Sequence, residues 1–267
     1  MICRQTFLGY SLTVPNAIFI SYFSIHHPRS YILVHRSYFI VHTSFLLIKH
    51  IFFDNDGTLV DSEIIAVRAT LRLLAPYGFQ MSEREYAQRY PGLLEKDILA
   101  AINAEYGITV NDDYFDELRK AHAQGFDDEL RVIPGMDDIF RGVKVPKSIV
   151  SNASRRHVEY CLQRLNLYDD LDGQIFSAEQ VGRPKPHPDV YLLALSTLQL
   201  DPEEVLVVED SPTGVQAAHA AGLQVIGLLA AAHIHPGHDT RLIEAGAKFL
   251  ATEANQLEKI FQQFKIM

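Results

Sequence analysis

The fold of this chain is decided by the stretch Ile48–Ser62, which reads IKHIFFDNDGTLVDS. Its first part, Ile48–Phe53, is a short apolar run that ends abruptly in polar residues, as a buried parallel strand does. Two aspartates, Asp54 and Asp56, follow this run, and Gly57 comes next. The stretch therefore predicts a strand whose carboxyl end leads two carboxylates into a tight turn.

Similar apolar runs recur along the chain and alternate with helical patterns. After residue 147 their spacing fits one strand and one helix per unit. This alternation predicts right-handed crossovers and an α/β fold built on a doubly wound parallel sheet. The further expected strands are Lys147–Ser151, Gln174–Ser177, Val205–Val208, Gln224–Leu229 and Lys248–Ala251.

The long interval between Phe53 and Lys147 carries only helical signals. An apolar stripe at helical spacing begins at Ile64, and we expect a charged helix over Asp112–Leu130. The simplest account is an all-helical cap domain inserted after the first strand. The predicted limits are an N-terminal extension over residues 1–46, the cap over 64–133, and a catalytic core over 47–63 and 134–267.

The N-terminal extension differs from the rest of the chain in composition. No Asp or Glu occurs before Asp54, whereas the whole chain carries 33 acidic side chains. Basic residues and histidines interrupt its apolar runs, so that none reaches the roughly 18 residues that a membrane-spanning helix needs. Three interpretations stay open: an over-extended start of translation, a targeting segment, or a functional arm. None of its residues suggests chemistry.

The overall composition excludes several classes of protein. Of 267 residues, 48% are hydrophobic and 21% charged, which is ordinary for a soluble globular protein and not for a collagen-like or disordered one. Two cysteines, Cys3 and Cys161, cannot form a disulfide framework and fit a reducing compartment, so we expect a cytoplasmic protein. The net charge of −9 argues against nucleic acid or a membrane surface as the main partner.

Polar residues follow the predicted strands at the edge where ligands bind in such sheets. Carboxylates gathered there repel one another unless a cation lies among them, and hard oxygen ligands suit Mg²⁺. A lysine and a serine beside a metal suit a phosphate, and a carboxylate can itself act as nucleophile. A phosphoryl-transfer site is therefore coherent by chemistry alone. The residues concerned are Asp54, Asp56, Ser151, Asn152, Lys185, Glu209 and Asp210.

The order and spacing of these residues resemble the haloacid dehalogenase (HAD) superfamily. Residues 54–62 look like its first motif, and Ser151, Lys185 and the pair Glu209-Asp210 stand where its second, third and fourth motifs would. The resemblance covers about residues 48–265. It includes a helical cap at the position used by the β-phosphoglucomutase-like phosphatases, a group that acts on sugar phosphates.

The resemblance implies a role for each motif. Asp54 would attack phosphorus and form an aspartyl-phosphate, while Asp56 would protonate the leaving oxygen and then activate water. Ser151 and Lys185 would bind the phosphoryl oxygens, with Asn152 adding its backbone N–H. Mg²⁺ would be held by Asp54 and Asp210 through their side chains, by Asp56 through its carbonyl, and by Glu209 as a further or outer ligand.

The implied function is a magnesium-dependent phosphatase for a small phosphorylated metabolite, such as phosphogluconate or a hexose phosphate. A sugar-phosphate mutase is the nearest alternative, but Ala66 stands where the β-phosphoglucomutase pattern has a histidine. A non-catalytic phosphometabolite sensor would be expected to lack Asp54 or Asp56. We expect a monomer or a weak homo-oligomer.

Two features outside the motifs carry further hypotheses. The cap loop Arg89–Lys96 is a candidate for substrate recognition, because Arg89 or Lys96 could pair with a second anionic group; each could equally be a solvated helix charge. The histidines His233, His235 and His238 could bind a transition metal, although Pro236 and Gly237 indicate a loop.

Overall fold

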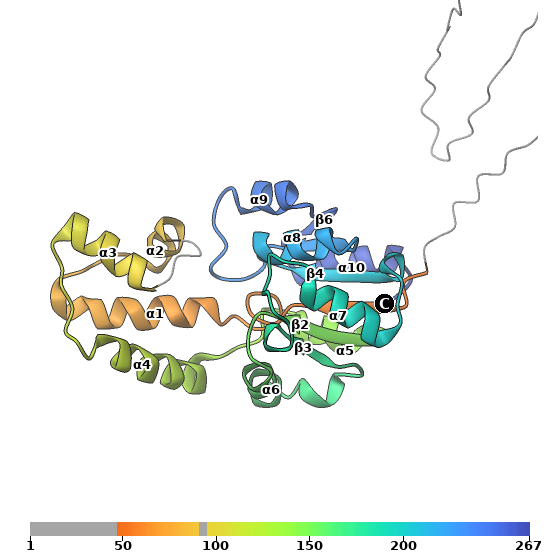
Figure 1. Ribbon diagram of the computed structural model, residues 1–267, viewed down its shortest axis with the longest axis horizontal. Coiled ribbons are helices and arrows are strands. Elements are labelled where there is room, and N and C mark those ends of the chain that lie inside the picture. Colours follow the sequence, from red (N-terminus) through yellow and green to blue (C-terminus); the bar gives the residue numbers. More distant parts are fainter. Residues whose placement is uncertain (1–46, 91–94) are drawn as a thin grey trace, which may run out of the picture. The chain divides into compact units, whose positions relative to one another are not determined.

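The computed structural model describes residues 47–90 and 95–267, so the N-terminal extension lies outside the described residues. Six strands form one sheet in the order β3-β2-β1-β4-β5-β6, and every neighbouring pair is parallel (Figure 1). This confirms the predicted doubly wound sheet. The strands are β1 (His50–Phe53), β2 (Lys147–Ser151), β3 (Ile175–Ser177), β4 (Val205–Glu209), β5 (Gln224–Leu228) and β6 (Phe249–Ala251).

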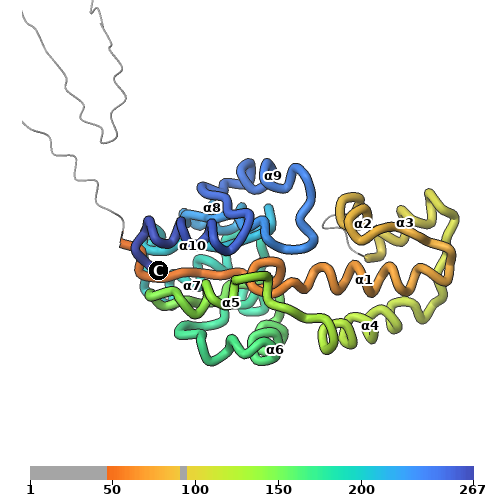
Figure 2. Tube along the Cα trace, turned by 180° about the vertical axis from the view of Figure 1, so that it is seen from behind, coloured from red at the N-terminus to blue at the C-terminus, as the bar shows by residue number. Residues whose placement is uncertain are grey.

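Helices cover both faces of the sheet because successive strand residues point to opposite sides. Ile51 and Phe53 pack with residues of α5, α6 and α10, whereas Phe52 packs with residues of α7 and α8. Helices α5 and α10 lie side by side (Figure 2). The core helices are α5 (Met136–Gly142), α6 (Arg155–Arg164), α7 (Asp189–Leu198), α8 (Pro212–Ala220), α9 (His238–Ala245) and α10 (Ala254–Gln263).

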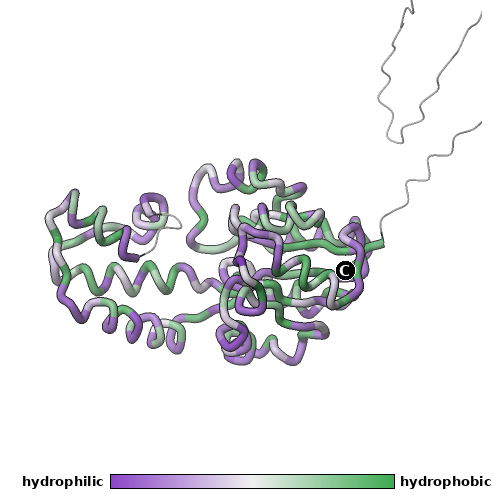
Figure 3. The backbone as a smooth tube through the Cα atoms, viewed as in Figure 1, coloured by the Kyte–Doolittle hydropathy of each residue, from purple (hydrophilic) through white to green (hydrophobic). Residues whose placement is uncertain are grey.

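In the described part of the chain, four α-helices lie between β1 and the return to the core at Ile133, as the predicted helical insertion requires. Helix α1 packs along α4, and these helices enclose an apolar cluster of their own that includes Tyr86, Tyr90 and Tyr114. Strand β4 is hydrophobic up to Glu209, whereas hydrophilic and hydrophobic residues alternate along α4 (Figure 3). The cap helices are α1 (Glu63–Leu74), α2 (Glu83–Arg89), α3 (Glu95–Tyr106) and α4 (Tyr114–Glu129).

The insertion is joined to the core by two chain segments that hydrogen-bond to each other. Asp61 N donates to Arg131 O, and Ile133 N donates to Leu59 O, both at 3.0 Å. The helices thus leave and re-enter the core at one place, which agrees with an inserted cap. The exact cap limits of 64–133 stay a prediction. Among the described residues, no helix combines the length and apolar character needed to cross a membrane.

Candidate active site

The register of the sheet brings the predicted residues to one edge. Phe53 of β1 lies opposite Ile149 of β2 and Val208 of β4, so these three strands end at nearly the same level. Asp54 N donates to Val208 O at 3.0 Å and continues this alignment by one residue. A cavity of about 830 Å³ opens at this edge; the predicted residues that line it are Asp54, Asp56, Ser151, Asn152, Lys185, Glu209 and Asp210.

Lys185 lies at the centre of the buried charges. Its ammonium group donates to Asp54 Oδ1 at 2.7 Å, to Glu209 Oε1 at 2.8 Å and to Val150 O at 2.7 Å, and only 2% of the side chain is exposed. These bonds use all three ammonium donors. Burial alone would lower the pKa of Lys185, but the charges of Asp54 and Glu209 outweigh it and raise that pKa well above its ordinary value. The lysine is therefore held charged.

The loop that carries Lys185 is fixed by the side chain of Asn152. Asn152 Oδ1 accepts from Lys185 N at 2.8 Å, and Asn152 Nδ2 donates to Lys185 O at 3.2 Å. This pair of bonds ties the loop after β3 to the residue that follows β2. Ser151 is buried next to it, and its hydroxyl accepts from Ala153 N at 3.0 Å. Asn152 thus has a positioning contact that the sequence did not reveal.

Three buried carboxylates offer a site for a cation. One oxygen each of Asp54, Glu209 and Asp210 lies within 4.8 Å of the others. Burial raises the pKa of Asp54 well above its ordinary value, and the charges of Glu209 and Asp210 add to the effect of burial. When all three are ionised, Lys185 balances only one of their three negative charges. The excess charge and the hard oxygen donors fit a divalent cation such as Mg²⁺.

Local features hold two of these carboxylates in place. Gly57 has a φ of +79°, and a Cβ there would lie 2.1 Å from Asp210 Oδ2, so only glycine fits this turn. Thr58 Oγ1 donates to Asp210 Oδ1 at 3.0 Å. Ser211 donates its N–H and its hydroxyl to Glu209 Oε2, and its hydroxyl also caps α8. Both oxygens of Glu209 are thus engaged by protein groups, which suits an outer position toward a cation.

Asp56 has different surroundings from Asp54, although two residues separate them. Its Oδ1 accepts from Ser62 Oγ at 2.6 Å and from His157 Nε2 at 3.0 Å. Burial acts to raise the pKa of Asp56, but the hydrogen bond and charge of His157 prevail and lower it. The bond to Asp56, with a smaller contribution from Cys161, raises the pKa of His157 to about 10. The pair is therefore an aspartate with an imidazolium.

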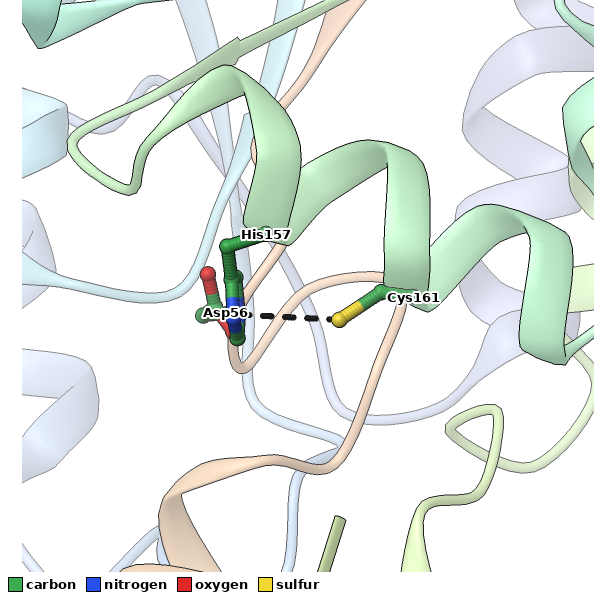
Figure 4. Close-up of side chains that lie close together, drawn as sticks. All are labelled: Asp56, His157 and Cys161. Atoms are coloured by element: carbon green, nitrogen blue, oxygen red, sulfur yellow. Dashed lines mark hydrogen bonds and ion pairs between the residues drawn. The ribbon is translucent and has the colours of Figure 1, made fainter. Parts of the chain in front are cut away.

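His157 is a site residue that sequence reasoning missed. It lies on α6 and faces Asp56, with Cys161 one turn further along the same helix (Figure 4). Cys161 is fully buried, and its sulfur lies 3.5 Å from His157 Nε2. The available signal was the spacing of four residues to Cys161, which places both side chains on one helix face. Nothing in the sequence related that face to Asp56.

The two cap residues expected to bind substrate lie elsewhere. Arg89 forms an ion pair with Glu105 and donates to Tyr106 Oη at 3.0 Å, and it does not line the cavity. Lys96 is exposed on α3 and does not line the cavity either. Residues 91–94 of the same loop lie outside the described residues. A role of Arg89 or Lys96 in substrate binding therefore stays a prediction.

The histidine cluster lines the cavity, and its ring nitrogens contact other protein groups. His233 Nε2 lies 3.2 Å from Asp210 Oδ2, and His238 Nε2 donates to Asp210 O at 2.6 Å. Arg241 donates to ring nitrogens of His235 and His238. The adjacent guanidinium repels a cation, so the arrangement disfavours the transition-metal hypothesis.

The comparisons with known proteins agree with this geometry. A family model described as haloacid dehalogenase-like hydrolase matches residues 51–228. The chain is 30% identical over 190 residues to a 6-phosphogluconate phosphatase of Escherichia coli, covering 71% of this chain and 86% of that protein. It is 30% identical over 205 residues to a phosphorylated carbohydrates phosphatase of Thermotoga maritima, covering 74% of this chain and 91% of that protein.

A solved structure shows the same fold. The HAD family hydrolase of Deinococcus radiodurans, crystallised with bound phosphate and sodium, superposes with a TM-score of 0.77 at 29% identity. The match covers 83% of this chain and 98% of that chain. Fold, site geometry and sequence similarity lead to one assignment: the chain belongs to the haloacid dehalogenase-like hydrolases.

Proposed function

We propose that this hydrolase is a magnesium-dependent phosphatase for a small phosphorylated metabolite, with an aspartyl-phosphate as intermediate. The observation that carries the proposal is the buried cluster of Asp54, Lys185 and Asp210 at the strand ends of one cavity. The names of the relatives, which act on 6-phosphogluconate and on phosphorylated carbohydrates, support a sugar phosphate such as phosphogluconate or a hexose phosphate.

In this proposal Asp54 is the nucleophile. One of its carboxylate oxygens forms a bond to phosphorus while the bond from phosphorus to the leaving oxygen breaks. Lys185 donates to Asp54 Oδ1 at 2.7 Å in this structure. With substrate bound, it would turn one of its three donors to a phosphoryl oxygen beside the nucleophile, together with the hydroxyl of Ser151 and the N–H of Asn152. A divalent cation held by the side chains of Asp54 and Asp210 and the carbonyl of Asp56 would neutralise phosphate charge.

Asp56 is proposed to handle the protons. His157 would pass its Nε2 proton to Asp56 across their 3.0 Å contact, and Asp56 would deliver it to the leaving oxygen. In the second half of the reaction Asp56 would take a proton from the water that attacks the aspartyl-phosphate. This attack releases phosphate and restores the carboxylate of Asp54. His157 acts through Asp56 and is a positioning residue.

The cavity supports a small substrate. The cap residues that line it include the neutral side chains of Val67, Tyr86, Ala87 and Tyr90, which suit a metabolite enclosed between cap and core. Cys161, a free buried thiol, is compatible with the cytoplasmic location that we propose. We also propose that the protein is a monomer or a weak homo-oligomer and that it has no nucleic-acid or membrane partner.

Phosphate release from a panel of phosphorylated metabolites tests this function. The purified protein is assayed with Mg²⁺ and with a chelator, beside Asp54→Asn and beside Asp116→Asn, which removes an exposed carboxylate of α4. We expect release that requires Mg²⁺, persists in Asp116→Asn and disappears in Asp54→Asn. Interconversion of phosphate isomers without release would instead identify a mutase, and binding without turnover would identify a sensor.

A further inference from the structure

Arg241 of α9 is a cavity-lining cation without an acidic partner. Its Nη2 donates to His238 Nδ1 at 2.9 Å and to His235 Nε2, and its Nε is buried without a hydrogen-bond partner. No carboxylate within the described ranges forms an ion pair with it. By contrast, the guanidinium groups of Arg68 and Arg183 are paired with carboxylates.

The histidines around Arg241 do not supply the missing negative charge. His238 Nε2 donates to Asp210 O, so its Nδ1 is a neutral acceptor for the guanidinium. His235 Nδ1 donates to Pro236 O at 3.1 Å, which leaves its Nε2 as a neutral acceptor in the same way. These tautomers are assigned from the hydrogen-bond network. They orient the guanidinium and leave its charge uncompensated.

The position of Arg241 relates it to the reacting centre. A single imidazole ring, that of His238, separates its guanidinium from the backbone of Asp210. The Lys185 ammonium is already bonded to Asp54 and Glu209, so it offers little to a second anion. Arg241 therefore lines the cavity with its Nε unpartnered, and no described group forms a hydrogen bond with its Nη1. A guanidinium with free N–H donors forms charge-assisted hydrogen bonds to carboxylate or phosphate.

We propose that Arg241 binds a second anionic group of the substrate, so that the enzyme acts on phosphorylated metabolites that carry either a carboxylate or a second phosphate. The inference rests on the proposed phosphatase function and narrows its substrate class. His233 and His235 also line the cavity, and their rings lie against that of His238, which accepts from Arg241. The sequence suggested Arg89 or Lys96 for such a contact; Arg89 is paired with Glu105, and neither residue lines the cavity.

Matched substrate pairs test the subsite. Gluconate 6-phosphate is compared with glucose 6-phosphate, and fructose 1,6-bisphosphate with fructose 6-phosphate, in the wild type, Arg241→Ala and Arg119→Ala. The last variant removes an exposed arginine of α4 as a charge-matched control. For the preferred substrate with two anionic groups, Arg241→Ala should lower kcat/KM about 100-fold. For the counterpart that lacks the second anionic group, kcat/KM should change less than about threefold, and Arg119→Ala should change kcat/KM for neither substrate.

The two pairs identify the anion, since the pair that responds shows whether the site takes a carboxylate or a phosphate. Equal losses on both members of each pair would overturn the proposal, because Arg241 would then act through His238 and Asp210. Unchanged kinetics in Arg241→Ala, or loss of the preference in Arg89→Ala instead, would overturn it as well. Arg241→Lys, which keeps the charge without the planar fork, should recover part of the preference.

A binding measurement separates this inference from the proposed function. Calorimetry on Asp54→Asn compares the same substrate pairs with and without Arg241→Ala. Tighter binding of the compound with two anionic groups, lost with Arg241, supports the subsite even if the wild type releases no phosphate and the phosphatase proposal fails. Equal affinities of Asp54→Asn for both members of each pair would refute the subsite even if the wild type is an active phosphatase.

Discussion

The core side and the cap side of the cavity carry different kinds of residue. On the core side Asp54, Lys185 and Asp210 are charged and almost completely buried. Helix α2 and the residue that follows it contribute the neutral side chains Tyr86, Ala87 and Tyr90. Glu63, the first residue of α1, also lines the cavity, while other charged cap residues such as Arg68 form ion pairs with carboxylates. This difference supports our proposal that the strand ends supply the chemistry and that the cap supplies enclosure and shape.

The largest effect is expected at the nucleophile on the core side. Asp54→Asn keeps the size of the side chain but removes the attacking oxygen, so kcat should fall by about 10⁴-fold or more. Circular dichroism and thermal unfolding check that the fold is intact. Turnover near the wild-type rate in a folded Asp54→Asn protein would show that the strand-end cluster is not the reacting centre.

The second prediction concerns His50, a buried titratable residue of the core at the other end of β1 from Asp54. His50 bonds to Ser148 Oγ at 2.9 Å, and burial lowers its pKa to about 4, although Asp172 opposes this. A pKa below the unfolded value means that the neutral form stabilises the fold. This contribution, about 3 kcal/mol, is complete above pH 6.5 and is lost as the pH falls toward 4.

Chemical denaturation between pH 7 and pH 4 measures this loss. His50→Gln cannot take up the proton, so its free energy of unfolding should fall less steeply than that of the wild type over this range. Other groups titrate in both proteins, so their contributions cancel in the difference between the two curves of unfolding free energy against pH. Parallel curves for the two proteins would contradict the lowered pKa of His50.

A smaller effect is expected for His157, which touches the chemistry only through Asp56. His157→Ala should lower kcat about tenfold and leave KM within about twofold, because the substrate makes no contact with the imidazole. His157→Gln keeps a donor toward Asp56 and should recover part of the rate. Steady-state kinetics on both variants test this, and a rise in KM at constant kcat would place His157 in substrate binding instead.

The smallest effect is expected on the cap side. Tyr90 lines the cavity, and its hydroxyl is buried without a partner. Tyr90→Phe should therefore raise KM about threefold through one lost substrate hydrogen bond, with kcat unchanged. A loss of kcat as large as that of His157→Ala would show that the cap contributes to the chemistry, against the proposed separation of roles between cap and core.

Much of the core side was predictable from sequence because a parallel sheet aligns its strand ends. Asp54, Ser151 and Asp210 each lie at or directly after the end of an apolar run, so their proximity follows once the strands pair. The helical insertion was predictable as well, because the interval before Lys147 carries only helical signals.

The remaining site residues depend on tertiary packing. His157 reaches Asp56 across 101 positions of the chain because α6 packs back over the sheet edge. Arg241 was not singled out, since a loop of histidines and glycine gives no periodic signal that predicts its path. Arg89 has a fitting charge, but Glu105 lies beside it in the folded cap. Such pairings are set by neighbours that no local pattern specifies.

Trapping the covalent intermediate tests the central claim most directly. The protein is mixed with a sugar phosphate that it hydrolyses, radiolabelled in the phosphate, and is quenched in acid during turnover; peptide mapping then locates the label. The account predicts label on Asp54 in the wild type, and none in Asp54→Asn. Rapid release of phosphate by the wild type with no label on the protein at any quench time would contradict the aspartyl-phosphate mechanism.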